Sequence, residues 1–460
     1  MIKFGTDGWR GIIGDDFTFQ NVKIVAQAVA DYLIKIKGKR VVIGYDTRFL
    51  SREFASAAAA VLSANKIKVD LSLCCVPSPV VSFNTFHGKY DLGIIITASH
   101  NPSQFNGLKI KTKEGGAADK SLTDKIEKFL YKHKPKEPLK DTLRRRFLRE
   151  KDLTSVYLAF LRKFVDIRRI KALKLKILID VMYGAAGSFA QDILSSRTIK
   201  IDYLHNEFNP SFGGIHPEPI AQNLKELIMR IKKGKYDFGV ALDGDGDRIA
   251  LIDRKGNFIG AQEILPLLTI HMVKNRKEAG GVGKTVVGSN LIDCVAATLG
   301  VGCFEVPVGF KYISNLFKER LICIGGEEAG GIGFKGYIPE RDGTASLLMV
   351  LEMIAYQGIA FSTLISTLRK KYGRWHYMRT SLPLRRVSKN LDQLKLPSLL
   401  LGKKIERVNR MDGVKLITKN SWLMFRRSGT EPIVRVYAEA KTRHETERLL
   451  AVGKRLVYAL

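Results

Sequence analysis

Cysteine is scarce in this chain of 460 residues, which has five, an odd number, and no C-x-x-C pair. Such a set excludes a disulfide framework and a structural zinc site of the usual spacing, and it suits a reducing compartment. The first residues contain no apolar run of the kind that signal peptides carry. We therefore expect a cytoplasmic protein.

Long hydrophobic runs are also lacking. The most apolar stretch, residues 344–368, contains Glu352, Gln357 and several hydroxyl side chains. A membrane-spanning helix needs about 20 mainly apolar residues. The stretch therefore predicts a buried helix and a following segment, and no membrane partner is expected.

Acidic residues are few as well, with 45 Asp and Glu against 76 Lys and Arg, a formal net charge of +31. Such a surplus can attract nucleic acid, an anionic membrane surface or an anionic substrate. The basic residues are spread along the chain, densest in residues 120–176, and no zinc-finger spacing or aromatic-rich RNA motif accompanies them. We expect a solvated basic surface and no nucleic-acid partner, although the field would favour a phosphorylated substrate.

Three common catalytic or nucleotide-binding motifs are missing. Residues 283–285 read Gly-Lys-Thr like the end of a P-loop, but Glu278 stands where the first glycine is required. The Gly-x-Gly pairs do not extend to a full dinucleotide fingerprint, and Gly-x-Ser-x-Gly is absent. We expect no ATP site, no NAD site and no hydrolase elbow.

What the chain does have is a repeated strand-and-loop pattern. Residues 90–94 (Tyr-Asp-Leu-Gly-Ile) are echoed by residues 236–240 (Tyr-Asp-Phe-Gly-Val), and a third apolar strand covers residues 321–324. Each runs into a polar loop, and ligands of open α/β sheets bind at the carboxyl ends of strands. With the alternating helices, this predicts three related α/β domains.

The rest of the chain divides around these units. The basic, proline-containing residues 133–151 predict a linker or a surface crossing. After about residue 371, strand-like segments and an amphipathic terminal helix predict a smaller α+β domain. The predicted domains cover residues 1–135, 150–253, 254–370 and 371–460.

The loop of residues 243–248 is the strongest local signal. Asp243, Asp245 and Asp247 alternate with glycine or precede Arg248, so their oxygens can turn onto one hard cation such as Mg²⁺. An EF-hand is excluded because Arg248 and Arg254 occupy its Gly and Glu positions. The alternative is a turn in which the carboxylates accept hydrogen bonds from the turn's own main chain. Three carboxylates placed directly after a buried strand would be costly in free energy without a cation.

Ser99 lies in the second polar loop, with His100 beside it and Lys109 ten residues on. A serine in this setting near a Mg²⁺ loop suits a phosphoryl carrier, because the cation neutralises phosphate oxygens and polarises the Ser–O–P bond. A capped turn is the alternative, and it is favoured when the loop is taken alone.

Two weaker signals point to a phosphorylated sugar. Arg426 with Ser428, Gly429 and Thr430 has the composition of an anion-binding nest, in which backbone N–H groups and a guanidinium grip phosphate. Glu327, in a glycine-flanked loop with a second glutamate, could accept hydrogen bonds from sugar hydroxyls.

Taken together and in this order, the four loops resemble the α-D-phosphohexomutase family, the phosphoglucomutase and phosphomannomutase group. The resemblance covers essentially the whole chain, from residues 4–11 to residues 426–432. It implies an α/β fold in which three similar α/β/α domains with mixed sheets and a smaller α+β C-terminal domain surround a central cleft.

The resemblance also implies roles for individual residues. Ser99 would carry the phosphoryl group, and the three aspartates would hold Mg²⁺ with an oxygen of the Ser99 phosphate. Lys109 resembles the family's general acid/base lysine. The other implied site residues are His100, Arg10 and Arg248 in the active site, and Glu327, Ala329, Gly309, Lys311, Arg426, Ser428, Gly429 and Thr430 around the sugar and the distal phosphate.

Two departures from the family pattern concern the sugar loop. Many members have Ser where this chain has Ala329, so one sugar hydrogen bond is lost or passes to water. Bifunctional members often end the loop with His, here Gly331, and any catalytic role of that His cannot be carried over.

The implied activity is reversible transfer of phosphate between positions 1 and 6 of a hexose, through phospho-Ser99 and a hexose 1,6-bisphosphate that also acts as activator. Glucose 1-phosphate is the preferred substrate, mannose phosphate follows closely and glucosamine phosphate is third. A non-catalytic sugar-phosphate-binding relative is the alternative of another class, and a metal-dependent phosphatase would use the same Asp loop. The expected partner is a hexose phosphate, and the chain is expected to be a monomer or dimer.

Overall fold

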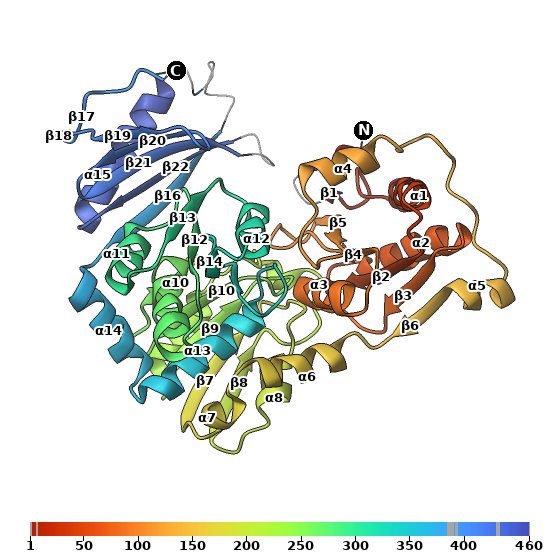
Figure 1. The fold of residues 1–460 in the computed structure, drawn as a ribbon, viewed down its shortest axis with the longest axis horizontal. Helices are drawn as coiled ribbons and strands as arrows, with labels where there is room; N and C mark the ends of the chain where they lie inside the picture. Colours follow the sequence, from red (N-terminus) through yellow and green to blue (C-terminus); the bar gives the residue numbers. More distant parts are fainter. Residues whose placement is uncertain (1, 6–7, 384–390, 392–393, 429–432, 460) are drawn as a thin grey trace. The chain divides into compact units, whose positions relative to one another are not determined.

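The computed structural model describes residues 2–5, 8–383, 391, 394–428 and 433–459 (Figure 1). Its contacts divide the chain into two compact units. The first unit consists of Met1–Ala261, Phe317–Glu319 and Ala329–Ser362, and the second of Gln262–Leu316, Arg320–Glu328 and Thr363–Leu460.

The first unit begins with a six-stranded sheet, in which only β5 runs antiparallel to its neighbours β1 and β4. Strand β4 is buried at every residue, as expected of a strand covered on both faces. The strand order is β1 (Gly8–Ile12), β5 (Phe105–Thr112), β4 (Leu92–Ile96), β2 (Arg40–Tyr45), β3 (Lys68–Ser72) and β6 (Leu148–Lys151).

Helices cover both faces of this sheet. Alternate residues of β2 point to opposite faces, and Val41 and Ile43 pack in one core with residues of α1 and α2. Gly44 faces the other way, where Val81 of α3 lies so close that a Cβ would be 2.4 Å from it. The result is an α/β/α layer domain. Its helices are α1 (Phe19–Lys35), α2 (Ser51–Ala64), α3 (Ser78–His87), α4 (Lys120–Glu127) and α5 (Asp141–Phe147).

The prediction of a linker over residues 133–151 is wrong at its end. Strand β6 pairs in parallel with β3, so residues 148–151 are an edge strand of the first sheet. Arg149 adds to this pairing, because its guanidinium donates to both carboxylate oxygens of Asp70 on β3, at 2.5 and 3.0 Å. The sequence predicted a solvated basic stretch because Asp70, the acidic partner of Arg149, is distant along the chain.

The second sheet of the first unit repeats the pairing of the first. Strand β9 is parallel to β7 and antiparallel to β10, as β4 is to β2 and β5, and β7 is parallel to β8 as β2 is to β3. The echo between residues 90–94 and 236–240 therefore marks equivalent strands. The order is β11 (Phe258–Ile259), β10 (Ile249–Asp253), β9 (Phe238–Leu242), β7 (Leu175–Asp180) and β8 (Ile199–Leu204). The helical segments are α6 (Thr154–Phe164), α7 (Ile167–Lys171), α8 (Phe189–Leu194), η1 (Phe212–Gly214) and α9 (Lys225–Lys233).

The second unit contains the third repeat. Strand β12 lies between β13 and β14 and is parallel to both, the arrangement of β2 between β3 and β4. The strands are β13 (Cys303–Val306), β12 (Gly281–Thr285) and β14 (Ile322–Gly326), with the short β15 (Ile332–Phe334) in the first unit. The helical segments are α10 (Ala261–Ile270), η2 (His271–Asn275), α11 (Asn290–Leu299) and α12 (Phe310–Lys318).

The C-terminal part of the second unit is an antiparallel sheet backed by one helix, α15 (Arg443–Tyr458), as Figure 1 shows. Leu449 and Val457 of that helix are fully buried with alternate residues of β22, so the predicted α+β domain is confirmed. The strand order is β16 (His376–Pro383), β22 (Ile433–Ala440), β21 (Ser421–Arg427), β20 (Val414–Thr418) and β19 (Arg407–Asn409), beside a small ribbon of β17 (Leu399–Leu400) and β18 (Lys403–Lys404).

The apolar stretch of residues 344–368 forms α13 (Gly343–Gln357), buried over its first twelve residues, and then α14 (Phe361–Tyr372). The predicted buried helix is confirmed, and the following segment is a second helix. Among the described residues, no single helix is long and apolar enough to span a membrane, and α13 with α14 reaches that length only as a broken pair.

Candidate active site

Ser99 follows β4 in a buried and strained position. Its φ is +56°, in the left-handed region that a side chain other than glycine rarely adopts, and its residue is only 1% exposed. The Ser99 N–H donates to Oγ1 of Thr97 at 2.9 Å, and His100 Nδ1 lies 3.4 Å from Ser99 Oγ. Such strain persists only where the surroundings hold the loop in place.

A buried arginine holds this loop. Arg48, 2% exposed, donates from Nε to Asp46 at 3.1 Å, and burial raises the pKa of Asp46 although Arg48 opposes that shift. Its two terminal nitrogens donate to four main-chain carbonyl oxygens of the loop, those of Ser99 (2.6 Å), Asn101 (2.6 Å), Pro102 (2.8 Å) and Phe105 (3.0 Å). Our sequence reasoning missed Arg48. The available signal was that Asp46, Thr47 and Arg48 directly follow an apolar strand, as the other motif loops do.

The loop after β9 brings Asp243, Asp245 and Asp247 together, each nearly or fully buried, with one oxygen of each within 4.8 Å of the others. Each carboxylate uses one oxygen in hydrogen bonds. Asp243 Oδ1 accepts from the N–H groups of Asp247 and Arg248, Asp245 Oδ2 from Ser78 Oγ and Lys109 Nζ, and Asp247 Oδ2 from Arg341 Nε.

The other oxygen of each aspartate is buried and has no hydrogen-bond partner among the described residues. Three orphaned carboxylate oxygens in one buried cluster are costly unless a cation satisfies them. Burial, with Asp247 and Asp245 nearby, raises the pKa of Asp243 well above its usual value. Burial also raises the pKa of Asp245, but the Lys109 ammonium, the hydrogen bond from Ser78 and the Arg341 guanidinium together outweigh it, so this pKa falls well below its usual value. The donor set fits a hard divalent cation with oxygen ligands.

The two loops touch. A Cβ on Gly244 would lie 2.7 Å from the carbonyl oxygen of Ser99, so glycine is required there for the Asp loop to approach so closely. Lys109, next to β4 in the sheet, also joins them, because its Nζ lies 2.9 Å from Asp245 Oδ2. The structure therefore brings Ser99, Lys109 and the three aspartates into one place.

Cations surround this place. Arg10 donates to Asn101 Oδ1 at 2.7 Å, and Arg248 Nε lies 3.8 Å from Asp243 Oδ2 and 3.9 Å from Asp247 Oδ1. Burial, then Arg248 and Arg10, holds the pKa of His100 well below its usual value. These surroundings favour the uncharged form of His100. A cationic, buried site suits phosphate.

The sugar-side residues fall mainly in the second unit. Glu327 is 9% exposed, whereas Ala329 already belongs to the first unit. Arg426 donates from Nε to Asp412 Oδ2 at 2.7 Å, and the same oxygen accepts from the N–H of Val308 at 2.9 Å. Asp412, which our sequence reasoning missed, thus joins Arg426 to the residue before Gly309.

The remaining sugar-side residues are placed less fully. Lys311 Nζ lies 5.0 Å from the centre of the Tyr312 ring. Ser428 donates its main-chain N–H to Ile433. The predicted residues Gly429 and Thr430 lie outside the described part of the chain.

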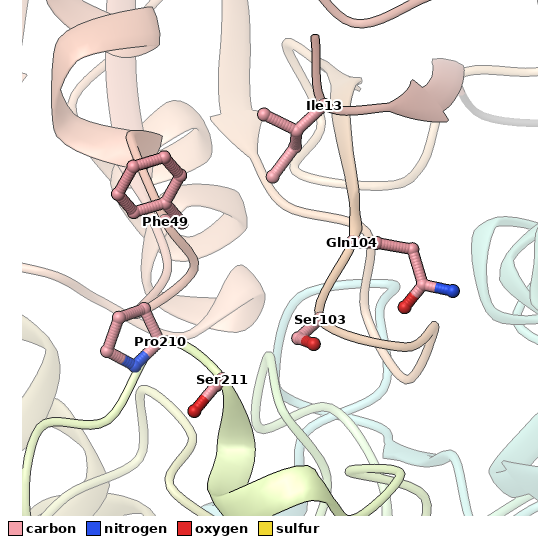
Figure 2. Close-up of a pocket in the computed structure, with 6 residues that line it drawn as sticks. All are labelled: Ile13, Phe49, Ser103, Gln104, Pro210 and Ser211. Atoms are coloured by element: carbon pink, nitrogen blue, oxygen red, sulfur yellow. The ribbon is translucent and has the colours of Figure 1, made fainter. Parts of the chain in front are cut away.

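An open pocket of about 400 Å³ lies in the first unit beside the Ser99 loop (Figure 2). Figure 2 shows Phe49 and Pro210 on one side and Ile13 and Gln104 on the other. None of its six lining residues is charged, so it is not suited to phosphate. The lining residues are Ile13, Phe49, Ser103, Gln104, Pro210 and Ser211.

Comparison with known proteins agrees with this geometry. The four domain models of the phosphoglucomutase/phosphomannomutase family match the chain: α/β/α domain I at residues 1–137, domain II at 155–256, domain III at 261–372 and the C-terminal domain at 388–452.

Similar proteins extend over the full chain. A phosphoglucomutase/phosphomannomutase of Thermococcus kodakarensis is 30% identical over 99% of this chain and 98% of its own. A phosphoglucosamine/phosphogalactosamine mutase of Sulfurisphaera tokodaii is 28% identical, with the same coverage. A crystal structure from Thermus thermophilus, provisionally named a phosphomannomutase, is 32% identical, covers 99% of both chains and has a TM-score of 0.89. The chain therefore belongs to the phosphoglucomutase/phosphomannomutase family, and it is a phosphohexomutase, an enzyme of the isomerase class.

Proposed function

We propose that the enzyme interconverts the 1-phosphate and 6-phosphate of a hexose through a phosphoserine at Ser99. The observation that carries this proposal is the direct contact between the strained Ser99 loop and the Asp loop, with Lys109 joining them. A serine that served only as a turn residue would not need burial, strain and three carboxylates beside it.

In the proposed transfer, each P–O bond that forms is matched by one that breaks. A hydroxyl of the sugar phosphate attacks the phosphorus of phospho-Ser99, the Ser99 Oγ–P bond breaks, and a hexose 1,6-bisphosphate forms. After the bisphosphate has reoriented in the site, Ser99 Oγ attacks the other phosphate of the bisphosphate, and the isomeric monophosphate leaves. Lys109, whose Nζ lies 2.9 Å from Asp245 Oδ2, and His100, whose Nδ1 lies 3.4 Å from Ser99 Oγ, are the groups placed to take part in proton transfer.

Asp243, Asp245 and Asp247 would hold Mg²⁺, which when bound supplies electrophilic stabilisation of the phosphoryl oxygens. Arg10 and Arg248 add positive charge that favours the anionic substrate. Arg426 and Ser428, with Gly429 and Thr430, would hold the phosphate distal to the reacting one, and Glu327 the sugar hydroxyls.

Glucose 1-phosphate is the proposed substrate, on the resemblance of the sugar loop and of residues 309–311 to glucose-type members. Mannose 1-phosphate is the second candidate, in line with the name of the Thermococcus relative. Glucosamine 1-phosphate is the third, in line with the relative named a phosphoglucosamine/phosphogalactosamine mutase.

The test is a mutase assay on glucose, mannose and glucosamine 1-phosphates with Mg²⁺ and a trace of the matching bisphosphate. Wild type should favour one sugar, and Ser99→Ala should lose turnover on the order of 10⁴-fold or more. Ser103→Ala, in the same loop, is the matched control and should stay near wild type. Full bisphosphate-dependent turnover by Ser99→Ala would show the phosphoserine route to be wrong.

A further inference from the structure

Gly331 stands where no side chain fits. Unlike Gly330, whose φ is +104°, Gly331 has no left-handed φ, so its backbone does not require glycine. The obstacle is Arg341. A Cβ at position 331 would lie 2.4 Å from Arg341 Cδ, and 3.3 and 3.4 Å from Arg341 Cβ and Cγ.

The arginine stem that fills this space ends on the Asp loop. Arg341 Nε donates to Asp247 Oδ2 at 2.7 Å, and the two side chains are 14% and 1% exposed. With Oδ2 held in this way, Oδ1 is the oxygen of Asp247 that stays buried and orphaned in the cluster with Asp243 and Asp245. Arg341 thus occupies one oxygen of Asp247 and leaves the other in the cluster.

The backbone around Arg341 is held firmly against the Asp loop. Ile249 N–H donates to Gly330 O, Asp342 N–H to Ile332 O and Gly343 N–H to Gly246 O, each at 3.0 Å. The first and third bonds tie Gly330 and Gly343 to residues 246–249, and the second ties Asp342 to Ile332, so the main chain on both sides of Arg341 is held in place.

The preceding residue is anchored as well. Glu340 forms a buried ion pair with Lys111 of β5, at 2.6 Å, and its other oxygen accepts from the Arg341 N–H at 3.1 Å. A side chain at position 331 would therefore move the flexible end of Arg341 away from Asp247, rather than the backbone that carries it.

We propose that Arg341 is a positioning residue that orients Asp247 for the cation, and that Gly331 is present because Arg341 needs its space. The proposal rests on the proposed function in one respect, the use of the three aspartates as a cation site. In this chain, the space that a side chain at position 331 would fill is taken by Arg341, which contacts the Asp loop.

A double-mutant cycle tests this coupling. Wild type, Gly331→Ala, Arg341→Ala and the double variant are titrated with Mg²⁺ in the absence of sugar by isothermal calorimetry, and kcat and KM are measured in parallel. Each single change should weaken Mg²⁺ binding about tenfold, the loss typical when a group that orients a ligand is removed. The double variant should bind no more weakly than Arg341→Ala, because the methyl group then has nothing to displace.

Gly116→Ala is the matched control, since its Cβ would meet nothing nearer than 3.5 Å and should leave Mg²⁺ binding unchanged. Thermal unfolding in EDTA identifies a variant that loses folding instead, and Arg341→Lys, which keeps the charge, should then restore part of the affinity. Additive single effects, a silent Gly331→Ala or tighter Mg²⁺ binding by Arg341→Ala would each overturn the proposal. A wild-type protein that binds Mg²⁺ but converts none of the sugars would instead refute the proposed function. The Mg²⁺ affinities of the four proteins would still test the role of Arg341.

Discussion

The loops after β4 and β9 occupy the same place in two sheets of the same pairing, yet they are held in different ways. The Ser99 loop is held by four of its main-chain carbonyl oxygens, which accept hydrogen bonds from the guanidinium of Arg48. The Asp loop is held by its carboxylates, each of which has one oxygen without a hydrogen bond among the described residues. A repeated fold thus supplies two neighbouring loop positions, and the side chains give one a hydroxyl on a strained backbone and the other three buried carboxylates.

The sheets also differ in the buried aspartate at the carboxyl end of the central strand. Beside β2, Asp46 is paired with an arginine, which keeps its charge at all relevant pH values. At the end of β7, Asp180 accepts from His205 Nδ1 at 3.0 Å, a group that titrates near neutrality. The ion pair of the first sheet is therefore expected to depend less on pH than that of the second sheet, which is strongest while His205 is charged.

The largest expected effect comes from Asp243→Asn, which attacks the Asp loop alone. The amide can still accept from the N–H groups of Asp247 and Arg248, but an NH₂ group can replace the orphaned oxygen. We expect kcat to fall on the order of 10²-fold or more. We also expect Mg²⁺ to raise the Tm of the wild type but not that of Asp243→Asn. Differential scanning fluorimetry and the mutase assay check this, with Asp202→Asn on β8 as control. An Asp243→Asn protein that Mg²⁺ still stabilises would show that the loop is not the cation site.

Arg48→Met attacks the support of the Ser99 loop. It leaves Asp46 buried without its cation and removes the Arg48 donors from four carbonyl oxygens, of which Pro102 O keeps the Phe105 N–H, so the free energy of unfolding should fall by about 3–5 kcal/mol. Urea unfolding measures this, and exposed Arg52→Met should change it by about 0.5 kcal/mol or less. Equal losses in the two variants would show that Arg48 is no special support.

Gly244→Ala tests the contact between the loops. Its Cβ would meet the Ser99 carbonyl at 2.7 Å, and because that atom is main chain, the loops must separate. We expect kcat to fall about 10- to 100-fold with little change in KM, since small misplacements of reacting groups have effects of this size. Steady-state kinetics checks it against Gly116→Ala. A change confined to KM would place the contact outside the chemical step.

The smallest effect concerns the second sheet and pH. The hydrogen bond to Asp180 raises the pKa of His205, against the opposing effect of burial. This raised pKa stabilises the fold fully below the ordinary histidine pKa of about 6.5, and the stabilisation is lost as pH rises through the folded-state value. His205→Asn should therefore destabilise the protein by about 1 kcal/mol or less at pH 6 and by less at pH 8, measured by urea unfolding. A difference that grows with pH would contradict this pairing.

Much of the fold follows from local patterns. The apolar strands before residues 97, 243 and 325 are where the sequence places them, because β-branched and apolar runs between turn residues form buried strands in any similar context. The edge strand β6 and the helix α14 were not predicted. β6 depends on Arg149 meeting Asp70, 79 residues away in the chain, and such pairs carry no periodicity.

The site divides in the same way. Ser99, Lys109 and the three aspartates are local motifs and were named from the sequence. Arg48, Asp412 and Arg341 were missed, because each acts on residues distant along the chain, as Arg341 does on Asp247 at a separation of 94 residues.

The sequence by itself determined the order of the strand-and-loop units and the local motifs that contain Ser99 and the three aspartates, since these depend on neighbours a few residues apart. Only the tertiary structure decided that the Ser99 loop is held with a left-handed φ over Arg48, and which oxygen of each aspartate has no hydrogen bond among the described residues. It also decided that the Arg341 side chain fills the space beside Gly331. The physical reason is that burial makes each unpaired polar atom costly, and its partner is chosen by what folding brings near rather than by what stands next in the chain.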